Sequence, residues 1–291
     1  MMVRLRVAGL TLAAHAPRPC RALALPAPTR TFAAAGGRDI RLEVTDAAPP
    51  APAPGSLLFE SGGLWRVHRR GARLLYLFHA PLPGAEVERA LDIDARWRAG
   101  TLFLPRVHWR ERPGFALGYP LDELLFQHRL AHDGALELHG CGLDVGGRAV
   151  IFCGSSGAGK TTTARLWRRR RPATAVMSDD RMVLRAQGRG FRAHGTPWHG
   201  SGRYARPEGR RLAALFFIHH APTTRAERLG TVEAAGEIFA RAFPPPWDAR
   251  VTGTVLDTCA RVAAAVPCFR LGFVPDASAV EAVERALGAR P

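Results

Sequence analysis

The sequence predicts a mixed α/β fold, α+β overall, with a β-rich N-terminal region at residues 1–119 followed by an α/β domain at residues 120–291. Short apolar runs bounded by Gly or Pro fill the first region, as is typical of strands. The second region contains, within residues 148–180, an apolar run, a glycine-rich loop, a helical stretch and another apolar run. This order indicates an α/β domain, and 291 residues suffice for two moderate domains.

Several strands are expected in the N-terminal region. Apolar runs predict strands at residues 40–44, 57–59, 64–68 and 74–78. Apolar residues alternate with arginines at the start of VRLRVAGLTL (3–12), which favours a first strand over a secretory signal. The Pro/Ala-rich segment 46–55 predicts a loop.

The second region alternates between helical and strand-like patterns. Leucines at helical spacing after Pro120 predict a helix that ends before Gly134. Further along the chain we expect strands at 135–145, 148–154, 173–180 and 212–220, a hairpin at 182–195 turning at Gly188 and Gly190, a helix at 161–170, and two or three closing helices that include 231–243 and 276–288.

Composition restricts the function classes. The net charge is +16 and the pI is about 11.3, but arginines are scattered along the whole chain and no nucleic-acid-binding motif accompanies them. We therefore favour a biased residue usage over a nucleic-acid partner. No run approaches the roughly 20 apolar residues of a membrane helix. Five cysteines without a CxxC pair indicate a reducing, cytoplasmic location.

The segment GSSGAGKT matches the phosphate-loop pattern GxxxxGK[ST] at every fixed position. Its lysine is the only lysine among 41 Lys and Arg residues, whereas glycines at such spacing are common in this chain. An apolar strand precedes the motif and a helix follows it, so we favour a nucleotide site over a chance glycine-rich turn. The predicted nucleotide-binding residues are Gly154, Ser155, Ser156, Gly157, Ala158, Gly159, Lys160, Thr161 and Thr162.

Each part of such a loop has a chemical role. Glycines let successive backbone N–H groups point at phosphate oxygens, and the following helix adds its positive N-terminus. Lys160 would contact the β- and γ-phosphates, and the Thr161 hydroxyl would bind Mg²⁺. The expected ligands are therefore ATP and Mg²⁺.

Two adjacent acids, Asp179 and Asp180, end an apolar strand some twenty residues after the loop. One carboxylate could lie near the metal while the other accepts the proton of an attacking hydroxyl. A solvated turn or a helix cap is the alternative for such a pair. The chain lacks the NKxD motif of GTPases and the LSGGQ motif of transporter ATPases.

Three motifs together resemble HPr kinase/phosphorylase, whose nucleotide-binding fold is related to that of phosphoenolpyruvate carboxykinase. They are LHG (138–140), GSSGAGKT (154–161) and SDD (178–180), and the resemblance covers roughly residues 135 to 190. PLDELL, GTPWHG and LGFVPD resemble segments of uncharacterised HPr-kinase-like proteins, some relatives of which phosphorylate a precursor peptide.

The resemblance implies transfer of the γ-phosphate from ATP to a Ser or Thr hydroxyl on a peptide or small protein. It implies Lys160 on the phosphates, Thr161 on Mg²⁺, Asp180 as the catalytic acid/base and His139 beside it. Asp179 is then the second catalytic candidate and the metal ligand. The family's later glutamate motif has no counterpart, and HGTPWHGSGRY (194–204) occupies that region.

Alternatives remain open at this level. The chain could be a nucleotide-binding regulatory protein without transfer activity, or a small-molecule kinase, and it could form a homo-oligomer. His199, His219 and His220 are interpreted as structural residues. The arginine run 168–171 is interpreted as complementing the helix dipole, with docking of an acidic acceptor as the alternative.

Overall fold

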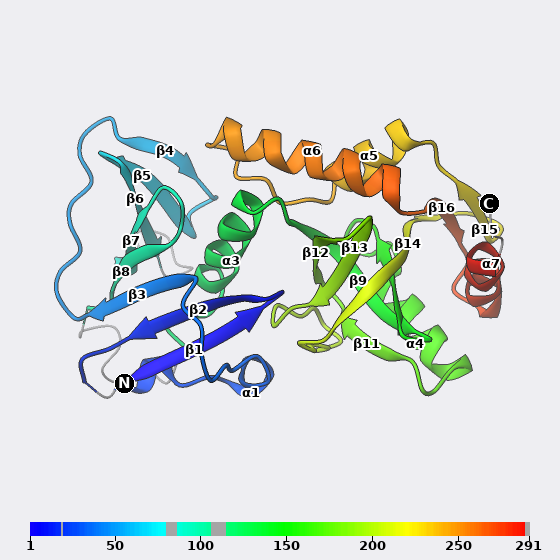
Figure 1. Cartoon of the computed structure of the whole chain (residues 1–291), viewed down its shortest axis with the longest axis horizontal. Helices are drawn as coiled ribbons and strands as arrows, with labels where there is room; N and C mark the ends of the chain where they lie inside the picture. The colour runs from blue at the N-terminus through cyan, green and yellow to red at the C-terminus, as the bar shows by residue number, and fades with distance from the viewer. Residues whose placement is uncertain (19, 80–85, 106–114, 289–291) are drawn as a thin grey trace. The chain divides into compact units, whose positions relative to one another are not determined.

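The computed structural model describes residues 1–18, 20–79, 86–105 and 115–288 (Figure 1). The fold is mixed α/β and α+β overall, with two large sheets and a β-rich N-terminal region, as the sequence predicts. No helix among these residues is long and apolar enough to cross a membrane.

The chain divides into two compact units. Unit 1 consists of Met1–Arg129 and Pro245–Ala249, and unit 2 consists of Leu130–Pro244 and Arg250–Pro291. The short segment belongs to unit 1 because the Trp247 ring lies among aromatic side chains there, 5.4 Å from Trp65 and stacked 5.1 Å from His128. The domain boundary at 119/120 stays a prediction.

Unit 1 contains an eight-stranded sheet in the order β1-β2-β3-β8-β7-β6-β5-β4 (Figure 1). The four strands expected from apolar runs are confirmed as β3 to β6, whereas β7 and β8 were not expected. The strands are β1 Met2–Val7, β2 Leu10–His15, β3 Ile40–Thr45, β4 Leu57–Glu60, β5 Trp65–Arg70, β6 Arg73–His79, β7 Val87–Asp94 and β8 Ala99–Phe103. The helices are the 3-10 turn Arg21–Leu23, α1 Ala27–Arg30 and α3 Leu121–His132, whose last three residues belong to unit 2. The segment 46–55 contains no helix or strand, as predicted.

The first strand expected from the alternation within 3–12 is confirmed as β1, but it ends at Val7, where the chain reverses. Ala8 and Gly9 have φ values of 48° and 86°, and β1 pairs antiparallel with β2 across them. Two consecutive positive φ angles are the geometry of a tight two-residue hairpin turn. The unbroken apolar pattern hid this turn, since alanine is an unusual residue for it.

Unit 2 contains the second sheet. Its strand β9 pairs antiparallel with three other strands, β10, β11 and β12. β10 also pairs parallel with β14, and β12, β13 and β14 pair in succession, so five strands close into a ring. The strands are β9 Leu136–Val145, β10 Arg148–Cys153, β11 Ala175–Ser178, β12 Arg181–Gln187, β13 Gly190–Gly195, β14 Gly209–His220, β15 Arg225–Arg228 and β16 Cys268–Phe273. The predicted hairpin at 182–195 is confirmed as β12 and β13.

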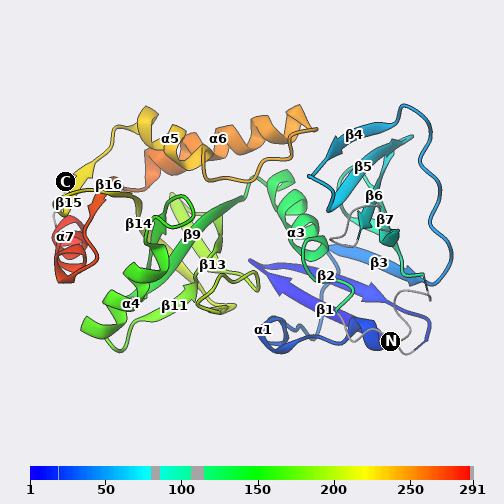
Figure 2. The ribbon, with the colours of Figure 1, turned by 180° about the vertical axis from the view of Figure 1, so that it is seen from behind.

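Helices cover both faces of this sheet. On one face, Ile151 of β10 belongs to an apolar cluster with residues of α5 and α6; on the other, Phe152 lies in a cluster with residues of α4 and α7. The strand β10 is therefore buried on both sides, which explains its apolar sequence. Helices α4 and α7 contact each other (Figure 2). The helices are α4 Lys160–Arg170, α5 Thr231–Phe239, α6 Ala249–Ala265 and α7 Ala277–Gly288.

Gly195 at the end of β13 provides a test of this packing. A Cβ atom there would lie 2.1 Å from the Arg206 carbonyl oxygen and 2.6 Å from that of Met177. Both are backbone atoms, so we expect Gly195→Ala to lower the free energy of unfolding by about 1–3 kcal/mol in urea denaturation.

Gly190, at the other end of the same strand, is the matched control because a Cβ there meets nothing within 4 Å. We expect Gly190→Ala to change the free energy of unfolding by less than about 0.5 kcal/mol. Equal losses in the two variants would contradict the close backbone approach at Gly195.

Candidate nucleotide-binding site

The glycine-rich loop connects the end of β10 to the first residue of α4. Gly157 and Gly159 have φ values of 81° and 109°, which side-chain-bearing residues rarely adopt. A Cβ on Gly159 would also lie 2.6 Å from the Phe273 ring. Helix α4 begins without a side-chain cap and without an acidic residue in its first turn. Its first N–H groups therefore suit an anion such as a phosphate.

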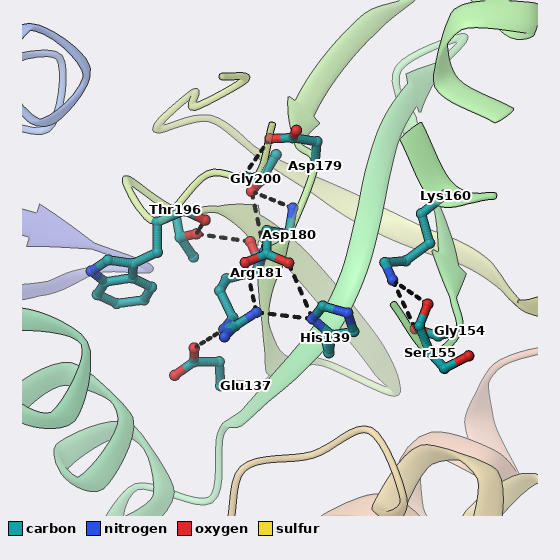
Figure 3. A network of polar contacts seen from close by, with 12 residues as sticks. Glu137, His139, Gly154, Ser155, Lys160, Asp179, Asp180, Arg181, Thr196 and Gly200 are labelled. Carbon is teal, nitrogen blue, oxygen red and sulfur yellow. Dashed lines mark hydrogen bonds and ion pairs between the residues drawn. The ribbon is translucent and has the colours of Figure 1, made fainter. Parts of the chain in front are cut away.

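Lys160 is folded back onto its own loop. Its Nζ atom donates hydrogen bonds to the carbonyl oxygens of Gly154 at 2.8 Å and Ser155 at 2.9 Å, and the residue is only 8% exposed (Figure 3). Burial lowers the pKa of the Lys160 amine, and the negative charge of Asp180 opposes that shift. The described part of the chain provides no carboxylate within ion-pair distance of this ammonium, which is thus held by neutral oxygens alone.

Asp179 holds a loop. The residue is 2% exposed, and its carboxylate accepts hydrogen bonds from the backbone N–H groups of Gly200 at 3.0 Å, Gly202 at 2.6 Å and Tyr204 at 3.3 Å. A Cβ on Gly202 would lie 2.6 Å from the same carboxylate. These bonds fold residues 200–204 around Asp179. Its roles as a metal ligand and a catalytic residue stay predictions.

Asp180 points into a cluster with His139 and Arg181 (Figure 3). Its carboxylate lies 3.2 Å from His139 Nδ1 and accepts a hydrogen bond from Arg181 Nη1 at 2.7 Å. Burial alone would raise the pKa of Asp180, but the His139 hydrogen bond and the Arg181 charge outweigh it. The net effect lowers the pKa below the ordinary value of 3.8, so the carboxylate is ionised at neutral pH.

Arg181 is a site residue that the motifs did not reveal. Its Nη1 atom also lies 2.9 Å from His139 Nδ1, and it pairs across the strands with that histidine. Because arginine only donates, this bond requires an unprotonated Nδ1, whereas the ion pair with Asp180 requires a protonated one. The two contacts therefore belong to different proton arrangements of His139.

Two further groups hold the Arg181 guanidinium in place. Its Nε atom lies 3.6 Å from the buried Glu137 carboxylate, and its Cζ atom lies 4.4 Å from the centre of the Phe243 ring. In the sequence, the only indication that Arg181 belongs to the site is its positive charge directly after the two acids.

The strand pairings bring the predicted residues to one region of unit 2. His139 lies on β9, the loop follows its neighbour β10, and Asp180 lies between β11 and β12, both of which pair with β9. Lys160 and Asp180 influence each other's ionisation. Thr161 and Thr162 lie half-buried in the first turn of α4.

The other histidines lie outside this cluster. His199 Nδ1 lies 3.0 Å from the Gly200 carbonyl oxygen. Burial and two neighbouring arginines lower the pKa of His194 to about 4, so it is neutral at physiological pH. His219 and His220 are exposed at the carboxyl end of β14.

The available oxygen atoms fit Mg²⁺. Within the described ranges, no group of three or more His, Cys, Asp or Glu side chains could hold a metal ion unaided. Mg²⁺ commonly takes only one or two protein oxygens and completes its shell with waters and substrate phosphates. The Thr161 hydroxyl and a carboxylate of the Asp pair match that requirement.

Comparisons with known proteins add little beyond fold. No protein-family profile and no curated protein matches the chain. Among solved structures, it is similar to the Hpr(Ser) kinase/phosphatase from Coxiella burnetii, with 12% identity, a TM-score of 0.30, and coverage of 52% of this chain and 94% of that chain. These values describe a distant fold relationship and assign no role to any residue.

The contrasting surroundings of the two acids lead to a stability prediction. We expect Asp179→Asn to lower the free energy of unfolding by about 2–3 kcal/mol, because the amide NH₂ would face backbone donors now bonded to a carboxylate. Asp180→Asn keeps partners that are partly exposed to solvent, so we expect a loss below about 1 kcal/mol. Urea denaturation at neutral pH measures both, and similar losses would contradict the loop-holding role.

The lowered pKa of Asp180 adds a pH dependence. Its ionised form stabilises the fold above the ordinary value of 3.8, and this contribution disappears as the pH falls through the lower folded value. The stability difference between wild type and Asp180→Asn should therefore shrink in that acidic range. A difference that grows on acidification would contradict the ion pairing.

Proposed function

We propose that the chain is an ATP- and Mg²⁺-dependent phosphotransferase that transfers the γ-phosphate to a Ser or Thr hydroxyl on a peptide or small protein. The observation that carries the proposal is that the strands pairing with β9 bring the glycine-rich loop with Lys160 and the ionised Asp180 to one region of unit 2. A phosphate-binding loop and a carboxylate base are the two parts that phosphoryl transfer needs.

The loop would bind the triphosphate. Backbone N–H groups at the start of α4 would contact phosphate oxygens, and Lys160 would exchange its two carbonyl acceptors for the β- and γ-phosphates. A flexible ammonium suits this position better than the planar fork of arginine. When bound through Thr161 and a carboxylate, Mg²⁺ would neutralise charge that develops on the phosphates.

Asp180 would act on the acceptor. The hydroxyl proton would pass to its carboxylate while the hydroxyl oxygen bonds to the γ-phosphorus, and the bond between that phosphorus and the β–γ bridging oxygen would break to release ADP. His139 and Arg181 would hold the carboxylate in place through their hydrogen bonds. Its low pKa is compatible with this role, because a loose transition state requires only weak base assistance.

A nucleotide-binding regulatory protein is the second candidate. The segment 194–204 stands where the resembled family has its glutamate motif; its residues 200–204 fold around Asp179, and it contributes no glutamate. A small-molecule kinase is a third candidate that the same machinery would serve.

Two variants test the proposal. We expect Asp180→Asn to lower phosphate transfer by about 100-fold or more, because it removes the base, while ATP affinity stays within about threefold. We expect Lys160→Ala to weaken ATP binding by at least about tenfold through loss of the ammonium. Calorimetry with ATP and Mg²⁺ measures binding, and labelled ATP with serine peptides encoded by neighbouring genes measures transfer.

Arg189→Gln, an exposed substitution on the β12–β13 turn, serves as the control and should change neither quantity. If the Asp180→Asn variant transfers phosphate as fast as wild type, Asp180 is not the catalytic base. ATP binding without transfer in the wild type would support the regulatory protein instead.

A further inference from the structure

A hollow lies against the helix that follows the phosphate loop. Its volume is about 300 Å³, and it is lined by Arg165, Arg168, Arg169, Pro172 and Tyr204. Three of the five lining residues are exposed arginines on α4, and none is acidic. The hollow is therefore strongly cationic.

Neighbouring arginines of the same segment differ in their pairing. Arg170 forms an ion pair with Glu281 at 3.0 Å, and Arg171 forms one with Glu284 at 2.9 Å. Within the described residues, Arg165 and Arg169 have no carboxylate partner, and Arg168 donates to the Tyr204 hydroxyl at 2.8 Å. The charges that remain uncompensated are those that line the hollow.

Helix stability does not explain all of these charges. Cations in the last turn of α4 complement its dipole, and Arg168, Arg169 and Arg170 lie there. Arg165 lies before that turn, three and four residues from Arg168 and Arg169, at spacings where like charges repel. A function outside the helix accounts better for its position.

The hollow is connected to the candidate nucleotide site. Tyr204 belongs to the loop that Asp179 holds through its backbone N–H, and α4 begins at Lys160. Eight residues of helix separate Lys160 from Arg168, an axial distance of about 12 Å. An extended peptide spans that distance with about four residues.

We propose that this arginine hollow binds acidic side chains of the peptide or protein acceptor, about four residues from the hydroxyl that receives phosphate. The identity of the acceptor rests on the proposed function, whereas binding of an acidic segment can be measured without phosphate transfer. A small hollow suits one or two carboxylates, while a nucleic acid would need an extended tract of contacts. The Arg168 guanidinium also lies over the Tyr204 ring, 5.7 Å from its centre. One face of that ring is therefore not accessible to a stacking nucleobase.

Fluorescence anisotropy with a labelled peptide tests the proposal. The probe carries four Glu/Asp residues, a short glycine spacer and one serine, and its matched partner replaces the acids with Gln/Asn. We expect the acidic peptide to bind wild type about tenfold more tightly than the neutral one at low salt. We expect Arg165→Gln/Arg169→Gln to lose about three- to tenfold in affinity for the acidic peptide.

Arg189→Gln/Arg211→Gln is the control, since it removes the same charge from two exposed arginines that do not line the hollow. It should retain affinity within about twofold, and both double variants should bind ATP as wild type does. Equal binding of the two peptides, or equal losses in the two variants, would overturn the proposal. Tighter binding of a single-stranded oligonucleotide that depends on Arg165 and Arg169 would overturn it in favour of nucleic acid. Loss of transfer with intact peptide binding would count against the proposed function alone.

Discussion

The pairing of β9 with three other strands is the constraint on which the candidate site depends. β10 delivers the glycine-rich loop, while β11 and β12 flank Asp179 and Asp180. β9 itself contributes His139. Close approach requires glycine on this strand: a Cβ on Gly140 would lie 2.9 Å from Ile151, and one on Gly142 would lie 2.5 Å from Met182. The LHGCG segment thus allows three strands to converge on one set of polar residues.

Asp179 and Asp180 have different surroundings and therefore different roles in this region. Asp179 is buried and satisfied by backbone donors, so it shapes the loop that follows β13. Asp180 lies at the solvent-accessible side, where Arg181 and His139 keep it ionised. In the proposed function, the Asp180 carboxylate would accept the proton of the acceptor hydroxyl, and Lys160 would bind the phosphates of ATP. The arginine hollow would then place the acceptor chain against the same loop that Asp179 organises.

Local patterns predicted much of this fold, and long-range contacts account for most of the rest. The glycine-rich loop and the strand β10 were predictable because the motif and the apolar run each lie within a few residues. β7 was missed because it carries Arg89 and Asp92, whose burial depends on partners distant in sequence. The part played by Asp179 depends on a loop more than twenty residues further along the chain, which folds back on it. No local pattern reports such a contact.

The single lysine makes the central claim directly measurable. Protein labelled with [¹⁵N]lysine gives one backbone amide resonance, that of Lys160 at the start of α4. Titration with Mg²⁺ and a non-hydrolysable ATP analogue should shift this resonance until it saturates, because the amide lies where phosphates would bind. Adenosine, which has no phosphate, should leave it in place. A resonance that stays unchanged at saturating analogue, in protein shown to be folded by circular dichroism, would contradict nucleotide binding at this loop.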